Sequence, residues 1–205
     1  MASADTPLRE EDVDADPVRQ FERWFEEASA VGIAQPEAAA LATAAPSGAP
    51  SVRMVLVKQA GPGGFAFYTN YASRKGDELA ANPRAALLFH WERLGRQVRI
   101  EGRVERVSRD ESAAYARTRP RGSRLSALAS PQSRPIESRD WLEQRVDELS
   151  ERYPGEDVPL SEEWGGYRLS PERFEFWQHR QSRRHDRLVY TPAEHGGWRI
   201  ERLGP

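Results

Sequence analysis

The sequence predicts a mainly β protein in which the strands form a barrel and the helices lie at its periphery. Many short apolar runs follow one another, separated by turn residues such as the Gly-Pro-Gly-Gly of residues 61–64. These runs do not alternate regularly with helical segments, which argues against a parallel α/β sheet. No repeat or linker interrupts the 205 residues. We therefore expect a single domain over residues 1–205, with residues 1–15 as a flexible N-terminal segment.

The first predicted helix begins at Asp16-Pro17, an N-cap residue followed by proline at the first helical position. Apolar side chains then recur at helical spacing, so this helix is expected to cover a core. They are Val18, Phe21, Trp24, Phe25 and Ala28.

The strands begin with a hairpin over residues 40–58, where two β-type runs flank a Pro-Ser-Gly turn. A short helix follows in residues 73–83, capped by Ser73 and ended by Pro83. In the strand that begins at Arg96, apolar and polar residues alternate, which gives it a buried and an exposed face. The other predicted elements are strands at 65–70, 84–91, 167–177, 187–190 and 198–203 and helices at 109–117 and 137–153.

Composition narrows the function classes. A hydrophobic content of 38% supports a folded core, and the net charge of −2 argues against a general nucleic-acid binder. Without cysteine, disulfides and thiolate chemistry are excluded, and four scattered histidines predict no metal site. No apolar run is long enough to cross a membrane, and the acidic start does not resemble a signal peptide. We expect a cytoplasmic protein.

One candidate anion site lies at the start of the second predicted helix. Ser73, Arg74 and Lys75 occupy its first turn, where free backbone N–H groups and the helix dipole attract an anion. Cations are electrostatically misplaced there unless a phosphate lies between them. The alternative is an ordinary capped surface helix.

A second cluster contains Tyr115, Arg119 and Ser123, spaced by four. Because Pro120 disfavours helix at Arg119, we interpret these residues as loop donors rather than as one helical face. A solvated basic loop is the alternative.

A third cluster follows the aromatic run that ends at Trp177. If the chain is extended there, Arg183, His185 and Arg187 project to one side. A solvated loop, a nucleic-acid patch and an anion pocket all fit this segment alone. Three cationic clusters in a slightly acidic protein favour more than one phosphate, as a phosphorylated flat cofactor and a phosphorylated substrate would supply.

The residues of these clusters lie in segments that together resemble the pyridoxamine/pyridoxine 5'-phosphate oxidase family. The resemblance implies an FMN-binding split β-barrel and a homodimer with FMN at each subunit interface. It also implies oxidation of pyridoxamine or pyridoxine 5'-phosphate to pyridoxal 5'-phosphate, by hydride transfer from C4' to flavin N5, with molecular oxygen reduced to hydrogen peroxide. The segments, in family order, are RMVLVK, FYTNYASRKGDELAANPRAALLFHWERLGRQVRIEGRVERVS, RPRGS, PQSRP, WGGYRLSPERFEFWQ, RRHDRLVY and WRIERLGP.

The resemblance further implies a set of site residues. It assigns Arg74 and Lys75 to the FMN phosphate, and it places Gln132 and Ser133 across the interface, in the site of the neighbouring subunit. The other implied FMN contacts are Arg53, Met54, Val55, Leu56, Val57, Lys58, Tyr68, Thr69, Gln97, Trp177 and Arg187. The implied substrate-phosphate residues are Lys58, Tyr115, Arg119 and Ser123, and those at the reacting end of the pyridine ring, which we take as catalytic, are Arg183 and His185.

Arg53 and Lys58 have opposite parity, so a regular strand cannot point both side chains to one face. A strand end, a bulge or backbone contacts would reconcile them.

The chain also departs from the family pattern in ways that bear on its substrate. His179 and Arg180 stand where the family commonly has two glycines, and the N-terminal Arg/Tyr lid of some members is not recognisable. Arg124, Ser126 and Leu128 alter a wall of the pocket. Two alternatives therefore stay open: a phenazine-pathway FMN oxidase acting on a tricyclic substrate, and a non-catalytic flavin or pyridoxal-phosphate binding protein.

Overall fold

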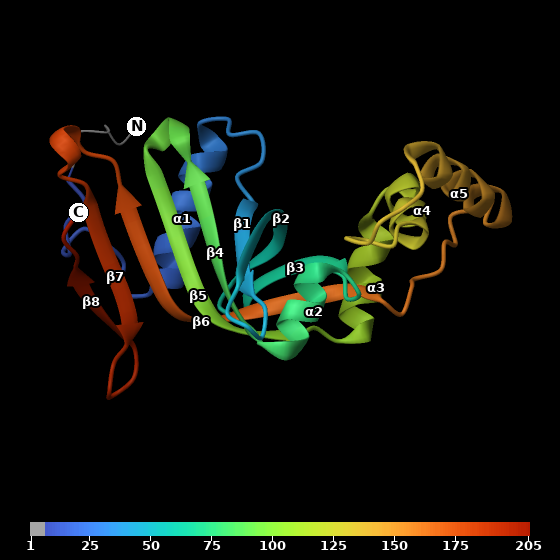
Figure 1. Ribbon diagram of the computed structural model, residues 1–205. Coiled ribbons are helices and arrows are strands. Elements are labelled where there is room, and N and C mark those ends of the chain that lie inside the picture. The colour runs from blue at the N-terminus through green and yellow to red at the C-terminus, as the bar shows by residue number, and fades with distance from the viewer. Residues whose placement is uncertain (1–6) are drawn as a thin grey trace.

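The computed structural model describes residues 7–205 as an eight-stranded antiparallel sheet with helices around it (Figure 1). The strand order is β3-β2-β1-β4-β5-β6-β7-β8, and a further pairing of β3 with β6 closes the first six strands into a barrel. The predicted barrel with peripheral helices is confirmed. The strands are β1 (Ala38–Ala44), β2 (Pro50–Gly61), β3 (Gly64–Asn70), β4 (Arg84–Trp91), β5 (Arg96–Arg106), β6 (Trp164–Gln178), β7 (Asp186–Pro192) and β8 (Trp198–Arg202).

Five α-helices and two short 3-10 helices accompany these strands in the described residues. They are α1 (Pro17–Ala30), α2 (Arg74–Ala81), α3 (Arg109–Thr118), α4 (Arg121–Ala129), α5 (Arg139–Arg152), η1 (Glu92–Leu94) and η2 (Gln181–Arg183).

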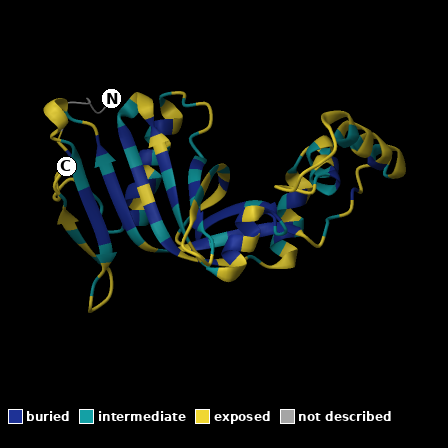
Figure 2. Ribbon diagram, viewed as in Figure 1, coloured by how far each residue is buried: buried dark blue, intermediate teal, exposed yellow. Residues whose placement is uncertain are grey.

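Helix α1 begins where the sequence predicts. The Asp16 side chain accepts a hydrogen bond from the Val18 N–H at 2.9 Å, which satisfies one of the free donors of the first turn. The helix buries its apolar stripe in the barrel core, where the Phe21 ring centroid lies 5.0 Å from that of Phe65 and 4.9 Å from that of Phe89. Figure 2 shows the same core as buried segments along the strands.

Strand β6 pairs with three other strands, β3, β5 and β7. Its first half pairs with β3 and its last five residues pair with β7, while β5 accompanies it along almost its whole length. The β5–β6 register shifts between Glu101 and Gly102, and a Cβ at Gly102 would lie 2.0 Å from the Ser170 carbonyl oxygen. Only glycine fits this close approach of the two backbones.

Strand β2 contains a bulge, one of the three alternatives that the parity of Arg53 and Lys58 left open. Val57 pairs with Phe67 and Gln59 pairs with Ala66, so Lys58 is the extra residue of a β-bulge. Before the bulge, Arg53 is turned toward the barrel, while Val52 and Met54 are 68% and 65% exposed on the outer face. Arg53 thus shares the inner face of Val55 and Val57, whereas Lys58 lines the same cleft as Leu56, so the bulge leaves Arg53 and Lys58 on opposite faces of β2.

The chain between β5 and β6 forms a helical arm that Figure 1 shows projecting from the barrel. The predicted helix end is confirmed, because Arg119 has an extended backbone with φ −79° and ψ 145°. The loop expected beyond it is instead α4, so Tyr115 and Ser123 are helical and only Arg119 lies between helices. The arm has its own small hydrophobic core. Arg121 links α4 to the end of α5, because its guanidinium donates hydrogen bonds to the carbonyl oxygens of Ser150 and Tyr153.

Residues 7–15, which we expected to be flexible, are attached to the C-terminal strands. Leu8 is 6% exposed, and its backbone N–H donates to the Asp186 carboxylate at 3.1 Å. The Arg202 guanidinium forms ion pairs with the carboxylates of both Asp186 and Glu10, each with a nitrogen–oxygen distance of 2.8 Å. The expectation for residues 1–6 lies outside the described part of the chain.

Within residues 7–205, no helix has both the length and the apolar character needed to span a membrane. The same residues contain no grouping of three or more histidine, aspartate or glutamate side chains suited to a metal ion.

Candidate functional site

A cluster of three cations, Arg53, Arg74 and Lys75, lies at the start of α2. Lys75 is 8% exposed, and its Nζ donates to neutral oxygens, at 3.0 Å to Thr69 Oγ1 and 2.7 Å to Gln132 Oε1. Burial and the charge of Arg53 lower the pKa of Lys75 to about 8. A buried ammonium group whose hydrogen-bond acceptors are all neutral is suited to receive an anion.

The cap of this helix differs from the prediction in one detail. Ser73 occupies the N-cap position and is fully buried, but its hydroxyl donates to the Asn70 carbonyl oxygen at 2.6 Å instead of capping the helix. The first-turn N–H groups of α2 are therefore not taken by the Ser73 side chain, which favours the anion-site interpretation over the ordinary capped helix.

A cleft of about 640 Å³ lies beside the cation cluster. Arg119 and Trp164 form part of its wall, and the Arg119 guanidinium lies 4.9 Å from the centroid of the Trp164 ring. All four predicted substrate-phosphate residues line this cleft together with several predicted FMN contacts. The members are Leu56, Lys58, Tyr68, Thr69, Tyr115, Arg119, Ser123 and Gln132.

Three aromatic rings stack along one wall of the cleft. Tyr68 and Tyr115 are stacked at 3.9 Å with an interplanar angle of 20°, and Trp164 lies nearly parallel to both rings. Burial and the nearby Glu111 carboxylate raise the pKa of Tyr68 to about 12, so its hydroxyl stays protonated at neutral pH. The wall therefore offers flat aromatic surface, and the Tyr68 hydroxyl lies buried behind it.

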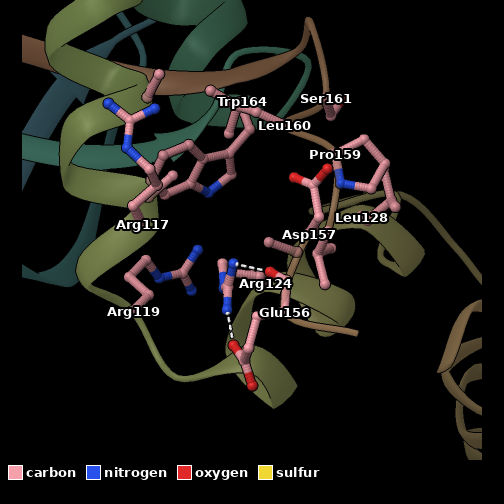
Figure 3. A pocket seen from close by; sticks show the side chains of 14 residues that line it. Arg117, Arg119, Arg124, Leu128, Glu156, Asp157, Pro159, Leu160, Ser161 and Trp164 are labelled. Carbon is pink, nitrogen blue, oxygen red and sulfur yellow. Dashed lines mark hydrogen bonds and ion pairs between the residues drawn. The ribbon is translucent and has the colours of Figure 1, made fainter. Parts of the chain in front are cut away.

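Arg119 also borders a second cavity, of about 430 Å³, together with Arg117 and Arg124 (Figure 3). Burial and the charge of Arg124 lower the pKa of Arg119. Arg124 is paired with Glu156 at 2.5 Å, whereas no carboxylate of residues 7–205 forms an ion pair with Arg119. Arg119 is thus a half-buried cation available to an anionic ligand.

A second group of predicted residues lies at the far end of β6. Gln97, Trp177 and Arg187 line a small cleft of about 250 Å³. The Arg187 Nε donates to the buried Glu175 carboxylate at 2.8 Å, and this hydrogen bond raises the pKa of Arg187. Arg99 holds the other carboxylate oxygen of Glu175 at 3.1 Å.

The turn that carries Arg183 and His185 connects β6 to β7 beside this small cleft. Ser182 and Arg183 both have positive φ, 55° and 59°, a strained conformation for residues other than glycine. The His185 ring lies 4.7 Å from that of Trp177, and its Nδ1 accepts a hydrogen bond from the Arg180 backbone N–H at 3.1 Å. A neutral His185 then carries its proton on Nε2, as a potential donor.

The predicted residues therefore form two groups within one chain. Trp164 of the large cleft and Trp177 of the small cleft lie near opposite ends of β6, and the path along the strand between them is roughly 40 Å at about 3.3 Å per residue. Figure 1 likewise shows β7 and α3 on opposite sides of the barrel. One ligand of ordinary size cannot touch both groups of a single chain.

Gln132 contacts the cation cluster of its own chain, where its Oε1 accepts hydrogen bonds from Thr69 and Lys75. Its expected contact with the site of the neighbouring subunit stays a prediction. The turn after α4 is held by Arg134, which contacts the Ala72 carbonyl and Asp77 of the same chain. Ser133, next in this turn, has a φ of 67°.

The segment from Arg53 to Lys58 also divides between the two faces of β2. Val57 is 5% exposed within the core and Val55 packs against the same core, so their side chains face away from the cleft. Met54 lies on the exposed outer face, and Leu56 lines the cleft. Of the valines, only backbone atoms are available to a ligand in the cleft.

Glu78, Trp164 and Glu175 are among the site residues that were not predicted. Both glutamates are 4% exposed, each in contact with predicted arginines. Glu175 had a visible signal, since it is the single acidic residue in the aromatic run FEFW. Glu78 lacks such a signal, because acidic residues are common in amphipathic surface helices.

Comparison with known proteins gives a consistent family. Residues 25–153 match the family described as pyridoxamine 5'-phosphate oxidase, and residues 164–205 match the pyridoxine 5'-phosphate oxidase C-terminal dimerisation region. The pyridoxine/pyridoxamine 5'-phosphate oxidase of Rubrobacter xylanophilus is 57% identical over 97% of this chain and 91% of its own length. The enzyme of the same name from Cupriavidus pinatubonensis is 55% identical, over 97% and 93%.

Solved structures agree with the fold. PhzG from Burkholderia lata, in complex with tetrahydrophenazine-1-carboxylic acid, superimposes with a TM-score of 0.90 at 30% identity and covers 98% of both chains. A pyridoxamine 5'-phosphate oxidase-related, FMN-binding protein from Nostoc punctiforme gives a TM-score of 0.72 at 18% identity, over 98% of this chain and 100% of its own, which supports the fold alone.

Proposed function

The chain belongs to the pyridoxamine 5'-phosphate oxidase family, and from this premise we infer that it is an FMN-dependent oxidase of phosphorylated B6 vitamers. It oxidises pyridoxamine or pyridoxine 5'-phosphate to pyridoxal 5'-phosphate. Molecular oxygen, which accepts the electrons from the reduced flavin and becomes hydrogen peroxide, is part of the same proposal. The observation that carries it is the 57% identity over 97% of the chain to an enzyme of that name.

The residues at the start of α2 fit the phosphate of FMN. The cation cluster offers three positive charges and the buried Lys75 lacks an anionic hydrogen-bond partner, as a site for one phosphate monoester requires. We propose that Arg53, Arg74 and Lys75 hold this phosphate and that Thr69 and Gln132 surround it. When bound, FMN supplies the redox chemistry by accepting a hydride at its N5 position.

The large cleft suits the substrate. We propose that Lys58 and Arg119 bind its phosphate, with the hydroxyls of Tyr115 and Ser123 as further donors. Binding the phosphate, which does not react, fixes the position of the reacting carbon over the flavin. The half-buried Arg119, stacked on Trp164, loses little side-chain freedom when it takes up the phosphate.

Arg183 and His185 are proposed to act at the reacting end of the pyridine ring. Arginine stays protonated, so Arg183 orients the substrate and stabilises negative charge. Because Nδ1 of His185 accepts a hydrogen bond, the proton of the neutral ring lies on Nε2. We propose that this Nε2–H donates to the substrate. The positive φ of Ser182 and Arg183 sets the path of the backbone turn that carries both residues.

Two copies of the chain complete this site. The match to a C-terminal dimerisation region supports a homodimer. We propose that the Trp177 group of one subunit faces the large cleft of the other, with FMN between them, because the two groups of one chain lie too far apart to share a flavin. The exposed apolar side chains of Val52, Met54 and Leu56 on β2 give the interface an apolar surface to bury.

The decisive experiment is a visible spectrum of the purified protein, followed by anaerobic addition of pyridoxamine 5'-phosphate. A bound flavin that is bleached by the vitamer, and a stoichiometric yield of pyridoxal 5'-phosphate, are expected. Flavin that stays oxidised with both phosphorylated vitamers would refute the proposal. Reduction of the flavin by tetrahydrophenazine-1-carboxylic acid, and not by the vitamers, would move the chain to the chemistry suggested by its likeness to the Burkholderia structure.

A further inference from the structure

A buried carboxylate lies beneath the cation cluster. Glu78, on α2, is 4% exposed, and its Oε2 accepts hydrogen bonds at 2.5 Å from both Thr43 and Ser51 of the β1–β2 hairpin. Arg53 contacts the same oxygen at 3.2 Å, and the Arg74 Nε donates to Oε1 at 2.9 Å. Burial alone would raise the pKa of Glu78, but these hydrogen bonds outweigh it and lower the pKa to about 2.

The same carboxylate organises Arg53. Thr43 and Ser51 give their protons to Glu78, so their oxygens are free to accept from the Arg53 guanidinium, at 2.5 Å each. The side chain of Arg53, which is 20% exposed, is thereby fixed between strand and helix. Arg74, by contrast, is 62% exposed and depends on Glu78 alone for an ion pair among the described residues.

The charges of this cluster do not balance. Arg53, Arg74 and Lys75 contribute three positive charges and Glu78 contributes one negative charge, which leaves an excess of two. A phosphate monoester at neutral pH carries a charge between −1.5 and −2. The nearest other acid on the helix, Asp77, is paired with Arg134 at 2.8 Å.

We propose that Glu78 is the internal counter-ion that holds the FMN-phosphate cations together before the cofactor binds, and is therefore a positioning residue of the cofactor site. This inference rests on the proposed FMN-dependent function. In the protein without cofactor, Glu78 is the sole negative charge paired with the cluster within residues 7–205. In the loaded protein the phosphate shares that role.

The proposal predicts an unusual pattern of stability. Glu78→Gln keeps the size of the side chain but removes its charge, so three cations face one another without a counter-ion in the cofactor-free protein. We expect its thermal midpoint to fall by roughly 10 °C, as loss of a partner from a buried ion pair would cause. FMN supplies replacement negative charge, so the loaded variant should lose less than half of that.

The experiment compares thermal midpoints of wild type and E78Q, each without ligand, with FMN, with riboflavin and with inorganic phosphate. Rescue by FMN and by inorganic phosphate, but not by riboflavin, is the expected result. Glu27→Gln is the matched control, because Glu27 pairs with the buried Arg96 at 2.6 Å far from the cluster, and its loss of stability should be the same with and without FMN.

An equal loss in the free and loaded forms of E78Q, or no loss in either, would overturn the proposal. If E78Q does not fold, the double variant with Arg53→Met should fold, because it removes one of the uncompensated cations; failure of both would also overturn it. None of these measurements uses turnover. Wild type that fails to bind FMN would count against the proposed function, whereas the counter-ion proposal is judged by the variants.

Discussion

The buried Lys75 ammonium predicts that FMN affinity falls with rising pH. Its pKa is lowered to about 8 from an ordinary 10.5, so the group loses its charge above pH 8 in the cofactor-free protein. A bound phosphate favours the charged form, so the complex retains a proton that the free protein has lost. The FMN phosphate ionises with a pKa of about 6 and does not change in this range.

The magnitude follows from the fraction of Lys75 that is charged. Between pH 7.5 and 9.5 that fraction falls about 25-fold for a pKa near 8, so the FMN dissociation constant should rise by up to about 25-fold. Titration of the cofactor-free protein, followed by the quenching of flavin fluorescence, measures this directly. Riboflavin, which lacks the phosphate, and Lys75→Arg, which stays charged, should both give a nearly flat profile.

A wild-type dissociation constant that is unchanged across this range would refute the reasoning. An equal slope for riboflavin would show that another group is responsible. Glu78 cannot supply the slope, because its pKa of about 2 keeps it ionised throughout.

Further predictions concern the two groups of site residues and the interface. Replacing Arg74 and Lys75 with alanine should weaken FMN binding by about 1.5–3 kcal/mol for each charge-assisted hydrogen bond lost, and equilibrium titration checks this. Arg119→Ala should weaken binding of the vitamer phosphate by about 2–5 kcal/mol, seen as a raised KM. His185→Ala should instead lower kcat with FMN still bound; loss of flavin from this variant would contradict its position at the substrate. Met54→Asp, on the exposed face of β2, should dissociate the dimer in sedimentation, and an unchanged dimer would move the interface elsewhere.

Most elements of the fold could be predicted from local patterns in the sequence. The cap at Asp16, the alternation in β5 and the hairpin before Lys58 each depend on neighbouring residues, and all were predictable. The opposite parity of Arg53 and Lys58 left a strand end, a bulge or backbone contacts open, and the structure has a bulge at Lys58. Helix α4 was missed because Pro120 was taken as the start of a loop, although proline is also compatible with a helix start.

The arrangement of the site was harder to predict from the sequence, because its residues come from distant segments that contact one another only in the folded chain. The resemblance implies that Gln132 serves the neighbouring subunit, and no local pattern indicates that it also contacts Lys75 of its own chain. Glu78 accepts hydrogen bonds from a hairpin more than 25 residues earlier in the chain, and no local sequence pattern predicts this contact. Likewise, no sequence pattern indicates that Trp164 and Trp177 line different clefts.

The separation of the two clefts along β6 has a genetic consequence. In a homodimer with sites between subunits, each site takes its cation cluster from one subunit and its Trp177 from the other. A variant without the cation cluster is inactive because both sites of its dimer are damaged, and the same holds for a variant without Trp177. A mixed dimer, however, combines both defects in one site and leaves the other intact. Random reassociation of equal amounts makes half of the dimers mixed, so about a quarter of the wild-type activity should return on mixing two inactive proteins. Two defective alleles in one cell would complement each other for the same reason.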